Sequence, residues 1–464
     1  MTAKTMVLVA AAIVSALLGP IAFGADAGPA PQTPAATAGP LPGMPPVVDP
    51  SNLYSETAAG HFSPAVAGAL ARVYVPEHGG DAVSVIDPAT MKVVDHFKVG
   101  SSPQHVVPAW DLKTLWVTNN NDFHRRDGSS LTPIDPLTGK PGKTIAVTDA
   151  YNMYFMPDGS AAIVINEAQA RLDFRDPHSM KLMYSITTPG CFGLNHADFS
   201  SDGTYAIFSC EFGGSIAKVD LVSRKIVAVL PLTRPADSLH KAEADILDIL
   251  DSEICRSPGV EQVRYSVRPS GDFGRSTGRR QRSHASRDNG NGVIMGHGTM
   301  GRGMPQDVRL SADGTVFYVA DMIADGVFLV DGNAFKVVGF LPTGPGAHGF
   351  CVSRDGKKLY VSNRGSHAMP SGLPNGRGSV SVIDFATRKV EATWPIPGGG
   401  SPDMGEVSAD GKVLWFSGRF DNEVYAIDTG NGAVTKIKVG SEPHGLTVWP
   451  QPGRYSLGHT GNMR

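Results

Sequence analysis

The sequence predicts an all-β protein, a seven-bladed β-propeller of four-stranded antiparallel blades, because one short phrase recurs along it. The phrase alternates apolar and polar residues, as expected of a half-buried strand. Its seven copies are RVYVPEHGG, TLWVTNNND, AAIVINEAQ, YAIFSCEFG, VFYVADMIA, KKLYVSNRG and VLWFSGRFD, beginning at Arg72, Thr114, Ala161, Tyr205, Val316, Lys357 and Val413. A repeat of this kind predicts an array of similar structural units.

The surroundings of the phrase define the unit. A turn of Asp and Gly precedes most copies, and a second alternating run that ends in Asp, such as SVSVIDFAT, follows most of them. With a strand on either side, each unit has four strands. The step from Tyr74 to Trp116 is 42 residues, and so is the step from Tyr318 to Tyr360. Four strands in about 40 to 45 residues are typical of one propeller blade.

The two ends of the array predict how the ring closes. The first blade begins directly at its second strand, ARVYVPEHGG, and the last strand, HGLTVWP from His444 to Pro450, has no following partner. If this last strand completes the first blade, both exposed sheet edges disappear. The alternative, an open solenoid, would leave the apolar edge at Val448 and Trp449 in water.

The segments LWVTN, LYVSN, SVIDFATRKVEATWPIPG and SEPHGLTVWP resemble the YVTN family of β-propeller repeats, which is related in pattern to bacterial surface-layer and periplasmic propellers. The resemblance covers about residues 70–232 and 304–450. It implies an exported propeller. The repeat residues build the blades, so function has to be sought elsewhere.

The N-terminal residues predict export. Lys4 precedes the apolar run MVLVAAAIVSALLG, and a small-residue site ends at Gly24, so residues 1–24 are interpreted as a signal peptide. A retained anchor helix is the alternative, although Pro20 shortens the apolar run. Residues 25–60 are expected to form a spacer rich in Pro and Ala, and residues 61–464 the propeller. The predicted location is the periplasm, the cell envelope or the extracellular space, with no membrane span in the mature chain.

The repeat is interrupted at about residues 233–303. This segment begins with the short helical pattern DSLHKAEADILDILDSEI and continues with an Arg- and Ser-rich stretch. Three interpretations are open: an insertion of low order, a basic arm for an anionic polymer, or a slipped reading frame in the gene. The net charge of −3 predicts no specific binding of nucleic acid.

Four cysteines in an exported chain raise the question of disulfides. Cys191 and Cys210 flank a predicted hairpin whose turn lies at Asp202 and Gly203, so a bridge between them is expected. Cys351 lies within a predicted strand and is expected to be a buried apolar side chain.

The innermost strands of a propeller begin at one mouth of the central channel, so residues at this step face one another. These strands contribute a predicted ligand-binding set, His105, Asn152, His196, Asp307, His348, Asp403 and His444, beside Gln104, Tyr151, Asn195 and Gln306. One interpretation is structural, with side chains that bond the backbone and channel water. The other is a site for a metal, a haem or a small anion, provided that three ligands reach one point.

A second candidate metal site is the segment MGHGTMGRGM. It brings Met295, His297, Met300 and Met304 together on a glycine-rich backbone, and thioethers with imidazole suit Cu(I). The segment SLGHTGNMR offers His459 and Met463 in a similar manner. The alternative is that these side chains only pack.

The sequence favours a binding scaffold, expected to be monomeric, with a protein, an envelope component or a small ligand as partner. Copper and haem are possible cofactors, and two enzyme classes stay open. A haem-dependent or metal-dependent oxidoreductase-related propeller could use His105, His196, His348 or His444, although no CxxCH motif is present. A lactonase-like hydrolase would need carboxylates, and those available are Glu77, Glu167, Glu211, Asp307 and Asp403.

Overall fold

The computed structural model describes residues 39–121, 128–234, 303–365, 377–459 and 461–464. Pro40–Arg464 forms one compact unit. The expected signal peptide, and all of the expected insertion except its two ends, lie outside the described residues. So do Met295, His297 and Met300 of the second candidate metal site.

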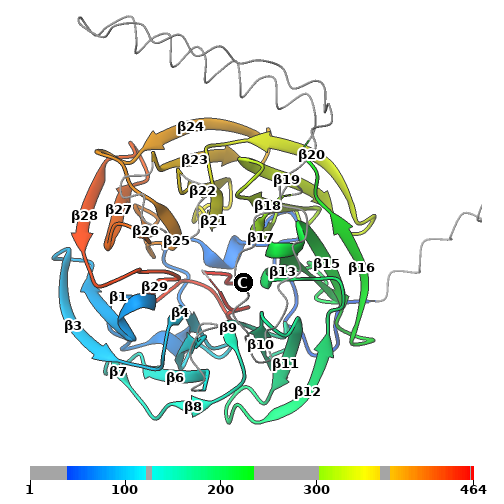
Figure 1. Ribbon diagram of the computed structural model, residues 1–464, viewed down its shortest axis with the longest axis horizontal. Helices are drawn as coiled ribbons and strands as arrows, with labels where there is room; N and C mark the ends of the chain where they lie inside the picture. The colour runs from blue at the N-terminus through cyan, green and yellow to red at the C-terminus, as the bar shows by residue number, and fades with distance from the viewer. Residues whose placement is uncertain (1–38, 122–127, 235–302, 366–376, 460) are drawn as a thin grey trace, which may run out of the picture. The chain divides into compact units, whose positions relative to one another are not determined.

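Seven antiparallel sheets form the blades, and they surround a central axis (Figure 1). From the axis outward, the first blade consists of β29 (Thr447–Trp449), β1 (Arg72–Glu77), β2 (Ala82–Asp87) and β3 (Lys92–Lys98). The second consists of β4 (Pro103–Pro108), β5 (Leu115–Asn119), β6 (Ser130–Asp135) and β7 (Lys140–Pro141), with β8 (Ile145–Ala146) also paired to β6. The third consists of β9 (Ala150–Phe155), β10 (Ala162–Asn166), β11 (Arg171–Arg175) and β12 (Leu182–Thr187).

The remaining blades repeat this order. The fourth contains β13 (Leu194–Phe199), β14 (Tyr205–Cys210), β15 (Ser215–Asp220) and β16 (Lys225–Pro231), and the fifth β17 (Pro305–Leu310), β18 (Val316–Asp321), β19 (Gly326–Asp331) and β20 (Lys336–Pro342). The sixth contains β21 (Ala347–Val352), β22 (Lys358–Asn363), β23 (Ser379–Asp384) and β24 (Lys389–Pro395), and the seventh β25 (Pro402–Val407), β26 (Val413–Gly418), β27 (Glu423–Asp428) and β28 (Val434–Lys438). The helices described are single 3-10 turns, η1 (Ser55–Thr57), η2 (Pro64–Val66), η3 (His78–Gly80) and η4 (Glu211–Gly213).

The predicted seven-bladed fold is therefore confirmed, and so is the way the ring closes. The last strand, β29, pairs antiparallel with β1, where Val73 lies opposite Val448. This pairing covers the edge that an open array would expose. Glu406 on β25 secures the closing strand from the other side, because its carboxylate accepts a hydrogen bond from Val448 N at 2.8 Å.

The hydrophobic core lies between neighbouring blades. In the contact of the third and fourth blades, for example, Ile163 and Leu172 belong to the same buried cluster as Phe208 and Val219. Inner strands such as β4 and β13 are buried along their whole length, whereas the outer strands β16 and β24 alternate between exposed and half-buried residues. The polar side chains at the start of the inner strands, such as those of β4 and β13, face the channel and form the candidate site.

The segment that precedes β1 packs against turns of the ring. Leu41 N donates to Asp202 O at 2.8 Å, and Leu53 N donates to Ala312 O at 2.7 Å. Residues 25–60 are expected from the sequence to form a spacer, but the part from Pro40 onward packs on the propeller. Its apolar side chains are the reason, because Leu41, Leu53 and Tyr54 are buried.

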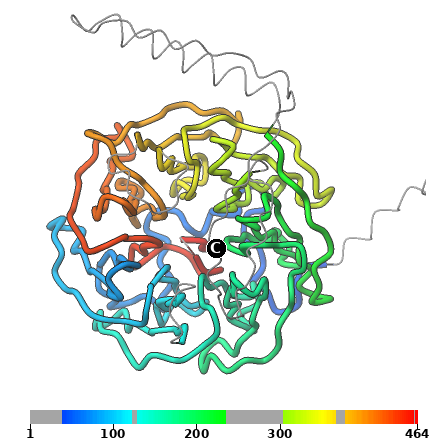
Figure 2. Tube along the Cα trace, in the orientation of Figure 1, coloured from blue at the N-terminus to red at the C-terminus, as the bar shows by residue number. Residues whose placement is uncertain are grey.

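Residues 451–464, which we call the tail, follow β29 and return to the centre of the ring (Figure 2). Within the tail, Leu457 N donates to Asn462 O at 2.7 Å and Arg464 N donates to Tyr455 O at 3.0 Å, so the segment folds back on itself. The sequence pattern of the blades does not extend into it.

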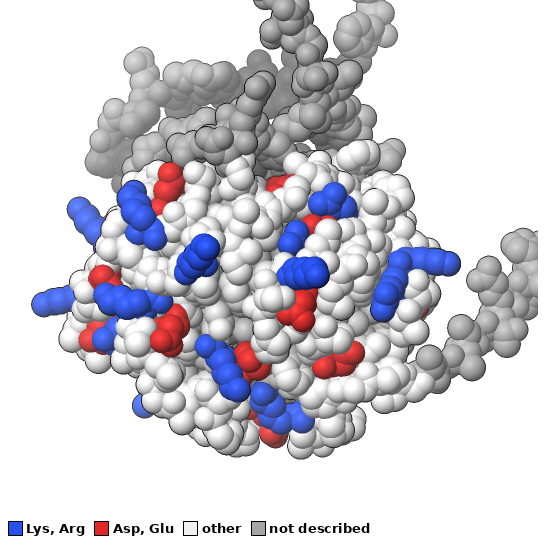
Figure 3. Space-filling view, turned by 90° about the horizontal axis from the view of Figure 1, so that it is seen from below, with Lys and Arg blue, Asp and Glu red and all other residues white. Residues whose placement is uncertain are grey.

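The surface charges and the cysteines bear on the predictions from the sequence. On the side shown in Figure 3, positive and negative side chains are interspersed, without a large field of one sign. The expected bridge is present, because Cys191 and Cys210 are joined by a disulfide. Cys351 is buried. Among the helices of the described residues, none is long and apolar enough to span a membrane.

Candidate functional site

The centre of the channel holds three buried imidazoles that we call the histidine triad. His105 comes from β4, His196 from β13 and His459 from the tail. One ring nitrogen from each lies within 4.8 Å of the others. The ring centroids of His105 and His459 are 4.3 Å apart, and those of His196 and His459 are 4.5 Å apart. The three side chains therefore converge on one point.

Bulges at the start of the inner strands help to place the first two histidines. The register of β4 against β5 shifts between Pro103 and His105, and that of β13 against β14 shifts between Leu194 and Ala197. A bulge releases residues from the ladder and re-aims their side chains. Hydroxyl groups on the second strands bind the released backbone: Thr118 Oγ1 accepts from His105 N at 3.2 Å, and Ser209 Oγ accepts from His196 N at 2.9 Å.

Gly445, beside the closing strand, leaves room for the ring of His105. A Cβ atom added at this position would lie 1.9 Å from His105 Nδ1. The backbones also touch here, since Val106 N donates to Gly445 O at 2.9 Å. The position of the His105 ring therefore depends on a glycine from the other end of the chain.

Several ring nitrogens of the triad have no hydrogen-bond partner among the described residues. Both ring nitrogens of His105, Nε2 of His196 and Nε2 of His459 are buried and have no hydrogen-bond partner there. Buried polar groups normally have partners, so such a group of orphaned nitrogens calls for an explanation. The other nitrogen of His196, Nδ1, lies 3.1 Å from Asn152 Nδ2 on β9, an NH2 group that can only donate to it.

Burial keeps these imidazoles neutral. Loss of solvent lowers the pKa of His105, His196 and His459 well below the usual value of 6.5, and the neighbouring histidines act in the same direction for His196 and His459. A neutral imidazole has a free lone pair on one nitrogen, which is the form that binds metal ions.

A second group of polar residues, which we call the Asp403 group, adjoins the triad. Its centre is Asp403, whose Oδ1 accepts from Arg364 Nε at 2.9 Å and from Arg364 Nη2 at 2.7 Å. His348 Nδ1 lies 2.8 Å from Oδ1, while His444 Nε2 and Arg419 Nη1 lie 3.4 Å and 3.7 Å from Oδ2. The ring of His444 is 4.6 Å from that of His105, so the two groups are in contact.

The charges of the Asp403 group fix its protonation. Burial by itself would raise the pKa of Asp403, but the Arg364 guanidinium, with His348 and Arg419, holds it well below the usual range. Burial, together with the charge of Arg364, lowers the pKa of His348 to about 4. The group therefore consists of a carboxylate, two guanidinium groups and neutral imidazoles.

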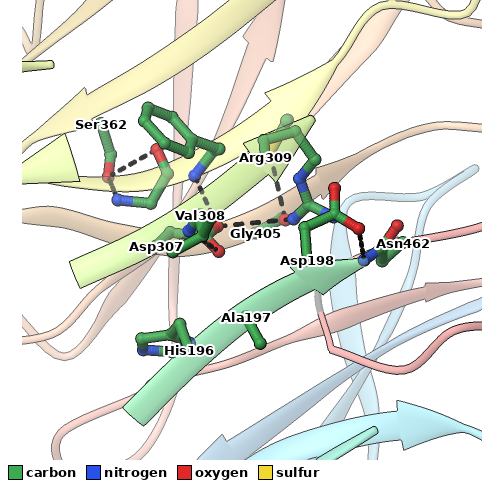
Figure 4. A network of polar contacts seen from close by, with 12 residues as sticks. His196, Ala197, Asp198, Asp307, Val308, Arg309, Ser362, Gly405 and Asn462 are labelled. Atoms are coloured by element: carbon green, nitrogen blue, oxygen red, sulfur yellow. Dashed lines mark hydrogen bonds and ion pairs between the residues drawn. The ribbon is translucent and has the colours of Figure 1, made fainter. Parts of the chain in front are cut away.

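Asp307, another predicted site residue, connects two neighbouring blades. Asp307 accepts from its neighbour Val308 N at 2.8 Å and from Phe350 N of the next blade at 2.9 Å (Figure 4). Asp198 acts in the same way one blade earlier, since it accepts from Leu310 N at 2.8 Å. The structure thus places the carboxylate of Asp307 in a contact between blades, and the histidine cluster does not include it.

The carboxylates considered for a lactonase do not form one cluster with the triad. Burial, followed by the charges of Glu167, Glu211 and Asp403, raises the pKa of Tyr151, so these three carboxylates lie around one phenol. Glu77 accepts from Gly440 N at 2.9 Å and lies 3.0 Å from His96 Nε2, where the first and last blades meet. Glu211 accepts from the amide of Asn195 at 2.5 Å. The metal-ligand cluster of the described residues contains histidines only, so these carboxylates do not supplement it.

Sequence reasoning did not assign His459 to the channel. The repeat located the inner-strand positions, whereas the tail lies beyond the repeat and no periodicity places it. Met304, from the glycine-rich segment, is described: its carbonyl accepts from Met322 N at 3.0 Å, and its own N donates to Asp321. Met463 packs in a hydrophobic cluster with Val66 and Trp449.

Comparison with known proteins supports the class of protein that the fold defines, a β-propeller. A family model described as YNCE-like β-propeller matches residues 292–452. Antigen Lp49 of Leptospira interrogans is 34% identical over 110 residues, which cover 23% of this chain and 24% of Lp49. The chain thus aligns with about a quarter of that relative's length. The protein is a β-propeller, and both partial matches support its resemblance to propellers of the YVTN type.

Solved structures share the fold at low identity. A candidate 6-phosphogluconolactonase from Bacteroides uniformis aligns with a TM-score of 0.52 and 14% identity, over 81% of this chain and 98% of that chain. A protein of unknown function from Desulfotomaculum acetoxidans aligns with a TM-score of 0.51 and 14% identity, over 82% of this chain and 99% of its own. At this identity the likeness concerns the architecture alone.

Proposed function

We propose that this propeller is a binding scaffold that holds a transition-metal ion at the centre of its channel. The ligands are the imidazoles of His105, His196 and His459. The observation that carries the proposal is the convergence of three buried ring nitrogens within 4.8 Å, at least one on each ring without a described hydrogen-bond partner.

The chemistry of the ligands defines the class of metal. Imidazole suits zinc, copper, nickel and iron, whereas magnesium and calcium prefer oxygen. Ligands about 2.0–2.1 Å from zinc lie roughly 3.3–3.6 Å from one another. Because the nitrogens lie within 4.8 Å of one another, the triad would have to contract by at most about 1.5 Å to reach this spacing. Three protein ligands also leave a position for water or a small ligand.

The side chains beside the open coordination position of the metal would determine which small ligand binds there. Tyr151 and His444 lie beside the triad, with ring centroids 5.4 Å and 4.6 Å from that of His105. The Asp403 group continues from His444 with one carboxylate and two guanidinium groups. This arrangement favours a small polar ligand over an extended apolar one.

The triad suits an ion better than a haem. The imidazole rings pack with centroids 4.3 Å and 4.5 Å apart, and this spacing leaves no room for a tetrapyrrole between them. A lactonase-like activity has less support, because the metal-ligand cluster of the described residues contains no carboxylate, and Glu77 and Asp307 are engaged in contacts between blades.

Export is part of the proposal. Disulfides persist in oxidising compartments, and the bond between Cys191 and Cys210 supports such a location. The relative Lp49 carries the description antigen, which also suits an exposed protein. Fractionation of cells, with sequencing of the mature N-terminus, would test the expected cleavage after Gly24.

Metal analysis of the purified protein tests the proposal. We expect about one zinc or copper ion per chain in the wild type, and loss of the metal in His105→Ala and in His196→Ala. The control is His178→Ala, because this side chain is 76% exposed on the surface. Circular dichroism verifies that each variant is folded. Full metal content in a folded His105→Ala/His196→Ala double variant would contradict the proposal.

A further inference from the structure

The third imidazole of the triad differs from the other two in its origin. His105 and His196 lie on inner strands of two blades, and each strand is fully buried in its sheet. His459 belongs to the tail, which enters the channel after the ring has closed (Figure 1). The triad therefore forms only when the tail is docked.

The tail is held against the third and fourth blades. Leu457 O accepts from Phe155 N at 3.0 Å, and His459 N donates to Met153 O at 3.3 Å. Farther along, Asn462 Nδ2 donates to Asp198 Oδ1 at 2.8 Å (Figure 4). Arg464 Nη2 donates to the same oxygen at 3.1 Å. These contacts set the position of the His459 ring.

A close approach of two backbones makes this docking sensitive to one residue. Gly458 has φ of +121°, a conformation that other residues rarely adopt. An added Cβ there would lie 2.6 Å from Met153 O. Gly458→Ala would thus displace the tail while it leaves all three imidazoles in the chain.

The closing strand of the ring is short. The pairing of β29 with β1 spans three residue pairs, whereas β14 pairs with β15 over six. A metal bound to His459, His105 and His196 would connect the tail beyond β29 to the second and fourth blades. The metal would thus link the C-terminal tail to the blades, in addition to the backbone hydrogen bonds between β29 and β1 that close the ring.

On the basis of the proposed metal site, we infer that metal binding and docking of the tail are coupled, so that the metal locks residues 451–464 into the channel. Coupling between two equilibria is reciprocal. Metal must therefore shift the docking equilibrium of the tail by the same factor by which a docked tail tightens metal binding. An ion bound by two rigid histidines alone would show no such dependence.

Hydrogen exchange and zinc titration on the full chain test the inference. In the wild type, we expect zinc to slow amide exchange in residues 451–464 by at least about tenfold. Gly458→Ala is expected to bind zinc at least about tenfold more weakly than the wild type. The matched control is Gly128→Ala, because a Cβ at Gly128 would meet nothing within 4 Å.

The outcomes separate the two proposals. If the wild type binds one zinc ion and its tail exchanges at the same rate with and without zinc, the coupling is disproved while the metal site stands. Equal zinc affinity of Gly458→Ala and the wild type would also overturn the coupling. If the wild type binds neither zinc nor copper, the proposed metal site itself fails. The exchange experiment needs no variant, so misfolding of Gly458→Ala would leave it decisive.

Discussion

At the scale of single residues, the site depends on small neighbours as much as on the histidines. Gly445 gives the His105 ring its place, Gly458 admits the tail, and hydroxyls of Thr118 and Ser209 hold the bulged backbone. A ligand set needs such support, because three imidazoles share one ion only when their neighbours hold the nitrogens close together.

Gly445→Ala should therefore weaken metal binding without removing a ligand. The new Cβ would lie 1.9 Å from His105 Nδ1, so the ring has to move. We expect roughly a tenfold loss of zinc affinity and a loss of about 1–3 kcal/mol in the free energy of unfolding. Isothermal titration and denaturant unfolding measure the two effects. Unchanged affinity would show that the ring of His105 is not a ligand.

Asn152→Asp should have the opposite effect on affinity. If Nε2 of His196 binds the ion, Nδ1 carries the proton and needs an acceptor. The oxygen of the Asn152 amide already accepts from Met153 N at 2.8 Å, whereas a carboxylate could accept from both donors. We expect zinc to bind about tenfold tighter, and the metal-free variant to be less stable because it buries a charge. Weaker zinc binding by the folded variant would argue against coordination through Nε2.

At the scale of elements, the inner strands both build the site and join the blades. The register shifts near the start of β4 and β13, and these bulges place polar side chains in the channel. Farther along the inner strands, Asp198, Asp307 and Glu406 accept hydrogen bonds from the backbone of the next blade. Glu406 is the contact that holds the closing strand. It also accepts from Gln451 Nε2 at 2.9 Å.

The charge of Glu406 should make stability depend on pH. Burial raises its pKa to about 7 from an ordinary value of 4.5, although Val448 N and Arg354 act against this. A carboxyl whose pKa is raised by folding stabilises the protein below its ordinary pKa, and this contribution is lost as pH rises from about 4.5 to 7. The loss is at most about 3 kcal/mol.

Thermal unfolding at pH 5 and pH 8 measures this contribution in metal-free protein. The wild type should be less stable at pH 8 on account of Glu406, and Glu406→Gln should show a smaller difference between the two conditions. Asp307, whose pKa burial raises to about 6, contributes in the same direction in both proteins. An identical pH dependence in wild type and variant would mean that Glu406 titrates near its ordinary pKa.

At the scale of the whole molecule, the candidate metal site belongs to no single blade. Its ligands come from the second blade, the fourth blade and the tail, and Gly445 from the closing segment completes it. The axis is the one place where all blades meet, so a ligand bound there contacts several units at once.

Zinc should consequently stabilise the folded protein as a whole. A ligand that binds only the native state adds about 2.7 kcal/mol at one hundred times its dissociation constant. We expect a rise in the melting temperature of the metal-free wild type upon addition of zinc, and its reversal by a chelator. His105→Ala should show no such rise, and an equal rise in this variant would assign the zinc effect to another site.

Much of the architecture follows from local pattern. Alternation specifies strands, the Asp-Gly turns specify hairpins, and the unpartnered last strand specifies closure, since each of these is a property of neighbouring residues. The channel positions of His105, His196, His348 and His444 follow from the same register. Asp307 shows the limit of this reasoning, because only the fold reveals that its carboxylate binds the backbone of the next blade.

The sequence by itself determined that this protein is a seven-bladed propeller, where its ring closes, and which two cysteines pair. The tertiary structure alone decided which polar residues converge. His105 and His459 are separated by 354 positions in the chain, yet their rings lie 4.3 Å apart. The reason is physical: periodicity records the pairing of neighbouring strands, whereas the meeting of three imidazoles on the axis depends on the curvature of the closed ring and on a tail that no repeat describes.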